Sequence, residues 1–268
     1  MELLAGMRSP FWQFEIQPEL NDAQDRIIFS YGDEHCAVTI LETRESNESG
    51  TKYEGTAFGQ PQQVIEQLKQ IPEQFLGDLE LMMNRDVYEA MDDELRAKFG
   101  THWGHEWEFF FATEPIPSVK GDDAVRVIKS GTEEYLHERE AILAVLKKAN
   151  PISEAVQNVD KLDWFVIPAD GGAQDSKLAC VMGAHENDGK MHFAGLATDQ
   201  DYRGRGLASA VMVATVNYWL EQGKVIHFGM WGWNHQARKL YLRLGLTRGA
   251  RLIIGGPRPF KDYSSLAV

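Results

Sequence analysis

Two kinds of hydrophobic spacing alternate along the C-terminal half of the chain. Short segments rich in Val, Ile and Phe are typical of strands, and longer segments with apolar residues three or four apart are typical of helices. We expect strands at 125–128, 163–167, 178–184, 191–198, 224–231 and about 252–254, and helices from Thr132 to about 148, at 207–221 and from Asn234 onward. This order predicts an α/β fold in which a mixed sheet carries helices on both faces.

Turn residues separate several of these elements. Asp170-Gly171-Gly172 lies between two of the strands, and the segment 186–189, Glu-Asn-Asp-Gly, predicts a hairpin turn. Asn150-Pro151 is expected to end the first helix, and Gly223 the helix at 207–221.

The N-terminal part of the chain has a weaker pattern. Strand-like segments occur at 26–30, 37–43 and 106–111, and helix-like segments at 61–69 and 86–99. These elements predict an α+β module, to which the sequence assigns no role.

A pair of prolines divides the chain. Pro115 and Pro117 lie two residues apart, where neither a helix nor a central strand can continue. The charge changes at the same place: residues 1–118 hold 8 Lys and Arg against 23 Asp and Glu, whereas residues 119–268 carry a net charge of +2. We therefore expect an acidic N-terminal domain, 1–118, and a second domain, 119–268.

A glycine-rich turn follows the strand at 191–198. From Gly195 the sequence reads GLATDQDYRGRG and then enters the helix at 207–221. Backbone N–H groups at a helix N-terminus, together with the helix dipole, favour an anion such as phosphate or pyrophosphate. Gly204 and Gly206 let the backbone approach such a group without a Cβ in the way.

Other glycine loops fit this segment less well. A nucleotide-triphosphate loop needs Gly-Lys-Ser/Thr after a strand, and here Gly206 is followed by Leu207 and Ala208. A dinucleotide loop needs a third glycine at position 209, which is Ser, and an acidic ribose partner at 222–226, which is missing. A simple tight turn with two glycines is the plain structural alternative.

The segment Arg203-x-x-Gly206-x-Ala208 resembles the Arg/Gln-x-x-Gly-x-Gly/Ala motif of the GNAT superfamily of acyl-CoA-dependent N-acyltransferases. A second segment, N-x-x-A-x-x-L-Y-x-x-L-G-L from Asn234 to Leu246, resembles the family in order and spacing. The resemblance covers 125–254, and actinobacterial GNAT proteins with an extra N-terminal domain are similar. It implies a GNAT-like sheet with two strands that splay apart, and the pantetheine arm of the cofactor pairs in that gap.

The resemblance also implies which residues hold acetyl-CoA, the expected acyl donor. The turn and the first helical turn would bind its pyrophosphate, the strand before them would pair with pantetheine, and the Asn234 side chain would bind the same arm or cap its helix. The expected binding residues are Leu196, Ala197, Thr198, Arg203, Gly204, Arg205, Gly206, Leu207, Ala208, Asn234 and Ala237.

Tyr241 matches the position of the family's general acid. A phenol titrates near 10 and a thiol near 8.5, so a neutral tyrosine can protonate a departing thiolate. A core aromatic at helical spacing is the alternative.

The general base is harder to place. Many relatives carry a Glu where this chain has Ala194, so the usual carboxylate is absent. His192 is the candidate side chain, on the same strand face by the period of two, and Asp199, Glu186 and His227 are also near the inferred site. An amine that arrives neutral, or that loses its proton to water, needs no side-chain base.

The expected reaction is direct attack of a primary amine on acetyl-CoA within a ternary complex. The acidity of residues 1–118 argues against nucleic acid and is compatible with a cationic small amine or peptide acceptor, while an acidic surface that only aids solubility is the alternative. The N-terminal domain either covers the acceptor side or mediates homodimerisation, and Trp231 and Trp233 wall an acceptor pocket or pack in a core. A catalytically weak acyl-CoA sensor or partner-binding module is the alternative, favoured by Ala194.

Composition limits the remaining classes. The apolar fraction is 43%, no 18-residue apolar run predicts a membrane span, and no signal-peptide pattern is visible, so we expect a cytoplasmic protein. Cys36 and Cys180 are expected to be buried free thiols. His102 and His105 lack the spacing of a metal site, and we expect no metal.

Overall fold

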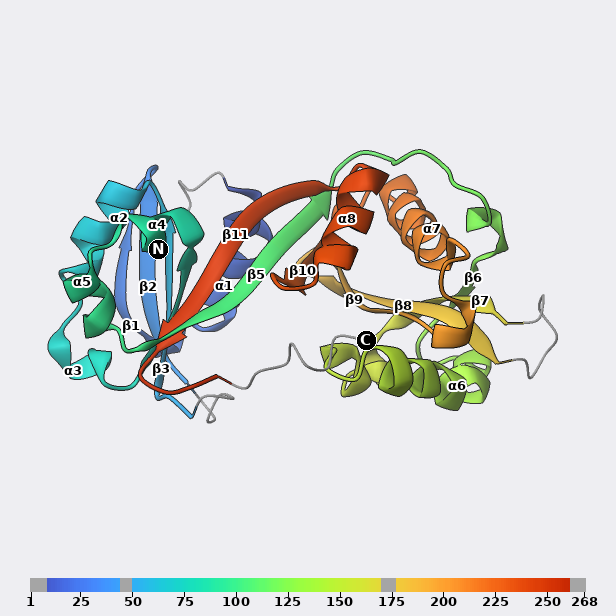
Figure 1. Cartoon of the computed structure of the whole chain (residues 1–268), viewed down its shortest axis with the longest axis horizontal. Coiled ribbons are helices and arrows are strands. Elements are labelled where there is room, and N and C mark those ends of the chain that lie inside the picture. The colour runs from blue at the N-terminus through green and yellow to red at the C-terminus, as the bar shows by residue number, and fades with distance from the viewer. Residues whose placement is uncertain (1–8, 44–49, 170–176, 261–268) are drawn as a thin grey trace. The chain divides into compact units, whose positions relative to one another are not determined.

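The fold is described from a computed structural model that covers residues 9–43, 50–169 and 177–260 (Figure 1). It divides into two compact units: unit 1 holds residues 1–109, 229–233 and 248–262, and unit 2 holds residues 110–228, 234–247 and 263–268. The units are discontinuous in sequence, and whether 1–118 and 119–268 fold as separate domains stays a prediction.

Unit 1 is built on a mixed sheet. Its strands follow the order β1 (Ile27–Gly32), β2 (Cys36–Glu42), β3 (Tyr53–Gly59), β4 (Leu79–Asn84), β11 (Thr247–Gly256) and β5 (His102–Ala112). β3 and β4 run parallel, whereas β1–β2, β2–β3 and β4–β11 are antiparallel.

The two faces of this sheet differ because successive side chains of a strand point to opposite sides. One face packs Val38, Ile40, Ala57, Leu81 and Met83 into a core that three short helices complete. The helices of unit 1 are η2 (Trp12–Ile16), α1 (Gln17–Asp22), η3 (Gln24–Arg26), α2 (Pro61–Leu68), α3 (Glu73–Leu76), α4 (Arg85–Ala90) and α5 (Asp93–Lys98). Val64, Leu68, Val87 and Leu95 from α2, α4 and α5 enter that core.

Three sequence expectations for unit 1 need correction. The segment 86–99 forms two helices instead of one, because Met91 is extended and Asp92 caps α5 by accepting from the Leu95 amide at 2.8 Å. The sequence pattern predicted no strand at the positions of β3 and β4. The expected strand at 106–111 is longer and begins at His102.

Unit 2 contains the expected mixed sheet with a helix on each face, except that the last expected strand, 252–254, lies in β11 of unit 1. Its strands follow the order β10 (Ile226–Trp231), β9 (Lys190–Thr198), β8 (Leu178–Asn187), β7 (Asp163–Pro168) and β6 (Arg126–Ile128). β9 and β10 are parallel, and the other neighbours are antiparallel. Of the expected turns, Asp170-Gly171-Gly172 lies outside the described residues.

The long helices α6 (Glu133–Ala149) and α7 (Leu207–Glu221) cover opposite faces (Figure 1). Trp164 and Val166 of β7 pack in a cluster with α6 residues such as Ile142 and Leu146. Phe165, between them in sequence, contacts the α7 rings of Tyr218 and Trp219. Thr132 caps α6 as expected, accepting from the Tyr135 amide at 3.2 Å. The remaining helices of unit 2 are η4 (Asp122–Ala124), η5 (Glu154–Val156), η6 (Val159–Lys161), η7 (Gln200–Tyr202) and α8 (His235–Leu244).

The proline segment, which includes Pro115 and Pro117, is hydrogen-bonded to α7. The Asn217 side chain accepts from the Ile116 amide and donates to the Ile116 carbonyl, each at 2.9 Å, and Ile116 is buried. The segment at which we expected a domain boundary therefore belongs to unit 2.

Two left-handed glycines shape β9. Asp188 and Gly189, with φ of 46° and 75°, make the two-residue turn from β8, which confirms the hairpin. Further on, Val181 pairs with Ala197 but Gly183 pairs with Ala194, so β9 carries one extra residue. Gly195, with φ of 73°, lies in this bulge.

Replacement of Gly195 by Ala tests how strongly the bulge depends on glycine. An added Cβ would lie 2.6 Å from the Ala155 Cβ and would keep a positive φ, so we expect a loss of about 3 kcal/mol in the free energy of unfolding. Gly189→Ala is the matched control, since its φ is similar and no heavy atom lies within 4 Å of its Cβ; we expect about 1 kcal/mol. Equal losses in urea unfolding would contradict the packing argument.

Candidate functional site

The N-terminus of α7 has the features of a candidate anion-binding site. Gly204 and Gly206 have φ of 75° and 83°, and Gly206 is the residue that precedes the helix. The first amides of α7 have no carbonyl one turn earlier to bind, and the first turn holds no acidic side chain. A Cβ on either glycine would meet nothing within 4 Å, so glycine serves the backbone conformation there and leaves open space above it.

Three arginines lie around this turn. Arg203 Nε donates to the Thr198 carbonyl at 3.3 Å, and Arg205 donates to the Asp201 carbonyl while its guanidinium lies over the Tyr202 ring. Both were expected from the sequence. Arg243 of α8 was not, yet its Nη2 donates to Ser209 Oγ at 3.3 Å in the first turn of α7. A basic residue near the end of α8 is common for any helix, which is why the sequence did not single it out.

The strand edge beside this helix is open as expected. Among the described residues, β9 and β10 pair only at Met191–Ile226 and His192–His227, after which β9 continues without that partner. Beyond this point the rings of Phe193 and Phe228 stack with their centroids 6.3 Å apart. The separation provides the edge with which an extended chain could pair.

The expected pantetheine residues of β9 have mixed environments. The Leu196 carbonyl already accepts from Asn150 Nδ2 at 3.2 Å, and Ala197 is buried in the core next to α6. Thr198 Oγ1 lies 3.2 Å from Cys180 Sγ.

Asn234 caps α8. Its Oδ1 accepts from the Ala237 amide at 3.1 Å, which confirms the capping role that the sequence allowed. The cap places Ala237 in the first turn of α8, and contact of either residue with a pantetheine arm stays a prediction.

Tyr241 lies inside an aromatic cluster. It is 7% exposed, and its ring lies edge-on to Phe228 at 4.8 Å and to Phe110 at 5.4 Å between centroids. Burial raises the pKa of the Tyr241 hydroxyl well above its ordinary value, because the phenolate would lose its hydration. The group therefore stays protonated at neutral pH, as a proton donor must.

His192 has a carboxylate partner that the sequence did not suggest. Its Nε2 lies 3.1 Å from Glu154 Oε1 of η5, with side-chain exposures of 18% for the histidine and 59% for the glutamate. The bond to His192 is the main reason that the pKa of Glu154 lies below its ordinary value, with burial acting against it. Glu154 is 38 residues away in sequence, so no local spacing could reveal the pair.

His192 is also the middle member of a row of histidines. His185 of β8 and His227 of β10 are its register partners, and both ring centroids lie within about 5 Å of its own, at 5.2 Å and 5.1 Å. His227 is fully buried, so it is unsuited to contact an acceptor in solution.

The other carboxylates considered near the site are engaged. Asp199 pairs with Lys148 at 2.8 Å, and this bond lowers the pKa of the Asp199 carboxyl. Glu186 pairs with Lys224 at 2.9 Å. Neither offers a better base than His192.

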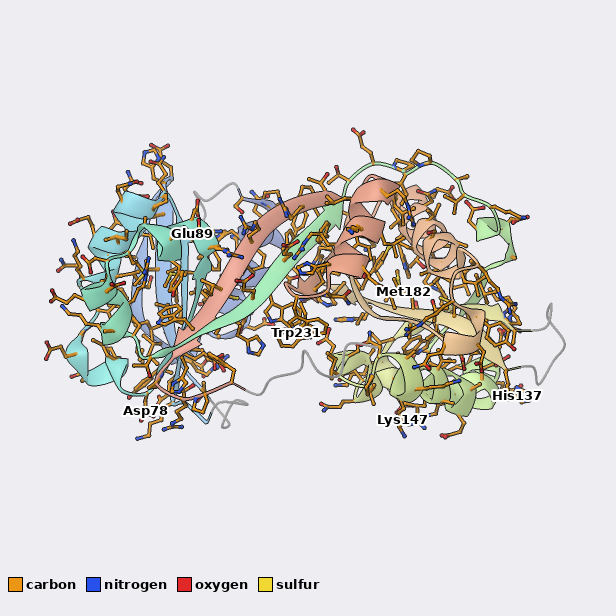
Figure 2. The ribbon with its side chains drawn as sticks, in the orientation of Figure 1. Asp78, Glu89, His137, Lys147, Met182 and Trp231 are labelled. Carbon is orange, nitrogen blue, oxygen red and sulfur yellow. The ribbon has the colours of Figure 1, made fainter. Side chains whose placement is uncertain are left out.

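The tryptophans suggested for an acceptor pocket belong to unit 1. Trp231, labelled in Figure 2, has its ring 4.3 Å from Trp107 and 6.1 Å from Trp233 between centroids. His105 lies 4.3 Å from Trp231 on the same measure. The two tryptophans thus take part in an aromatic row of unit 1, and a role in acceptor binding stays a prediction.

Both cysteines are free and buried, as expected. Burial raises the pKa of the Cys36 thiol to about 11 and that of Cys180 to about 12, so neither is a ready nucleophile at neutral pH.

The candidate site of this mixed α/β fold is therefore an open glycine turn at a helix N-terminus, beside two parallel strands that separate. Residues 134–246 match the family model of the acetyltransferase (GNAT) family, and they form a GNAT acetyltransferase domain. None of the curated proteins compared with the chain matches it.

Solved structures with the same fold are similar over nearly the whole chain. An acetyltransferase from the GNAT family of Colwellia psychrerythraea has a TM-score of 0.56 at 12% identity, covering 94% of this chain and 92% of its own. A GCN5-related N-acetyltransferase from Kribbella flavida has a TM-score of 0.52 at 15% identity, covering 94% and 98%. A putative GNAT acetyltransferase from Novosphingobium aromaticivorans has a TM-score of 0.50 at 15% identity, covering 92% and 95%.

No helix in the described part of the chain combines the length and apolar character that crossing a bilayer needs.

The Glu154–His192 pair predicts a pH dependence. Because His192 stabilises the Glu154 carboxylate, the wild-type carboxyl should be more than half ionised at pH 4.5, its ordinary midpoint. In His192→Asn the carboxyl midpoint should rise toward 4.5, as carbon-13 NMR titration can measure. Asp199, whose pKa is lowered by Lys148, is the internal control and should not move. An unchanged Glu154 midpoint would show that the pair is not formed in solution.

Proposed function

We propose that the GNAT domain transfers an acetyl group from acetyl-CoA to a primary amine, by direct attack within a ternary complex. The observation that carries this proposal is the open N-terminus of α7, where Gly204 and Gly206 leave room for the pyrophosphate. Arg203, Arg205 and Arg243 add positive charge around the same turn.

The donor would continue from this turn along the free edge of β9. The backbone at Leu196, Ala197 and Thr198 would pair with pantetheine, as the separation of β9 from β10 permits. Leu207 and Ala208 would contribute amides to the pyrophosphate site, while Asn234 and Ala237 at the start of α8 would contact the arm.

The chemistry needs two proton transfers. The amine nitrogen attacks the thioester carbonyl carbon, the C–S bond breaks, and the sulfur leaves with the bonding electrons. Tyr241 would protonate that thiolate, since its hydroxyl stays neutral where it is buried. His192, oriented by Glu154, would take the proton that the amine loses, directly or through water.

The acceptor class follows from charge. Residues 1–118 hold 23 acidic against 8 basic residues, which would attract a cationic amine or peptide and repel nucleic acid. We propose a cytoplasmic enzyme without a metal requirement, and homodimerisation through the acidic part of the chain as an arrangement to test by its solution mass.

Titration calorimetry with acetyl-CoA tests the donor site. Arg203→Ala should weaken binding about tenfold, the effect of removing one charge-assisted contact to a phosphate. Arg251, an exposed arginine of β11, provides a control with the same change of charge, and Arg251→Ala should bind like the wild type. Binding of no acyl-CoA, or equal loss in both variants, would contradict the proposed site.

Tyr241→Phe tests turnover separately from binding. We expect kcat in a thiol-release assay with a panel of amines to fall about 100-fold or more, the usual contribution of a positioned acid. The affinity for acetyl-CoA should stay within about twofold of wild type, because only one hydroxyl is removed. Unchanged turnover would refute the acid role, and acyl-CoA binding without transfer to any amine would favour the sensor instead.

A further inference from the structure

The two faces of the unit 1 sheet differ. One face packs against the hydrophobic core, and the other carries carboxylates. The residues that alternate with the core positions are Thr39 and Leu41 of β2, Glu54 and Thr56 of β3, and Glu80 and Met82 of β4. The N-terminal helical segment lies over this face through Ile16, Glu19 and Leu20. Together with Ile254 of β11, these residues line a partly open cavity of about 110 Å³.

The cavity is acidic. Glu19, Glu54 and Glu80 reach it from three different elements, and the described residues that line it include no lysine or arginine. Burial raises the pKa of the Glu19 carboxyl, and the nearby Glu54 and Glu15 raise it further, whereas Arg26 lowers it. Arg26 also donates from Nη1 to the Glu42 carbonyl, so part of its hydrogen-bonding capacity is used elsewhere. All the ionisable side chains among the described lining residues are therefore carboxylates.

Two buried hydroxyls on this sheet face have no hydrogen-bond partner among the described residues. Thr39 is 1% exposed, and its Oγ1 has no hydrogen-bond partner among the described residues. Thr56, its direct register partner on β3, also has a buried Oγ1 without a described partner. Buried hydroxyls are normally satisfied, so two adjacent exceptions at a cavity indicate a missing polar ligand.

The rest of the lining is hydrocarbon. Ile16, Leu20, Leu41, Met82 and Ile254 supply apolar walls beside the carboxylates. A metal ion would need its oxygen ligands gathered closely, but Glu19, Glu54 and Glu80 are not a group whose ligand atoms all lie within 4.8 Å of one another. A ligand that combines one charged end with a short apolar chain matches both parts of the lining.

We propose that this cavity of unit 1 binds a short-chain primary ammonium ion. Its three N–H donors would be shared among the glutamates and the threonine hydroxyls, and its alkyl chain would lie against the apolar walls. The cavity has about the volume of a few water molecules, which is enough room for an alkyl group of about four carbons. The proposal does not rest on acyl transfer, because the site is defined without any acyl-CoA contact.

An NMR titration of the full chain with n-butylammonium chloride, in the absence of acyl-CoA, tests the site. We expect saturable shifts of the backbone amides of Thr39 and Thr56, and much smaller shifts with the neutral, similarly shaped n-butanol. Glu54→Gln should weaken n-butylammonium binding about tenfold, through loss of one charge-assisted hydrogen bond. Glu34→Gln, at a carboxylate that is 78% exposed and outside the cavity, should leave binding unchanged.

Thr39→Val separates ligand binding from folding. Replacing an unpartnered buried hydroxyl by a methyl group should keep or raise the melting temperature, yet weaken n-butylammonium binding at least threefold. The proposal is overturned if the amides of Thr39 and Thr56 show no saturable shifts, or if Glu54→Gln and Glu34→Gln bind n-butylammonium with equal affinity. Equal binding of n-butanol, or a stronger response of the same amides to Mg²⁺ or Ca²⁺, would also overturn it.

Discussion

The geometry of unit 2 depends on β9, which remains paired with β8 on one edge while it leaves β10 on the other. Pairing with β10 ends at His192–His227, and the bulge at Gly195 then adds one residue to β9. The strand therefore presents an edge with unused backbone groups and ends beside the glycine turn that begins α7. Backbone groups that a fold leaves unpaired need water or a ligand, and the proposed donor would lie along this edge.

The two residues proposed for proton transfer in unit 2 lie in contrasting environments. Tyr241 is enclosed by aromatic rings, which keeps its hydroxyl neutral, whereas His192 is the middle member of a histidine row and has a partly exposed glutamate beside it. The two residues proposed for opposite proton transfers thus differ in burial and in polar partners. The two faces of the unit 1 sheet also differ. Helices with hydrophobic side chains cover one face, and the other face carries carboxylates around a small cavity.

Local sequence patterns predicted much of this structure. The caps at Thr132 and Asn234, the two-residue turn at Asp188 and Gly189, and the helix that follows Gly206 depend on near neighbours, and the structure confirms them. The single helix expected at 86–99 was wrong because Asp92 caps a new helix, a signal hidden inside a continuous amphipathic pattern. The strands β3 and β4 were missed because glycines and a short alternation weaken their pattern.

The sequence alone determined the class of unit 2, its glycine turn and the position of Tyr241, because these depend on residue types at short, regular spacing. Only the tertiary structure decided which distant residues meet. It brought Glu154 to His192, Arg243 to Ser209 and Asn217 to the proline segment, contacts that span 38, 34 and 101 residues. It also joined three glutamates of unit 1 in one cavity, since strand register, not sequence distance, sets which side chains share a face.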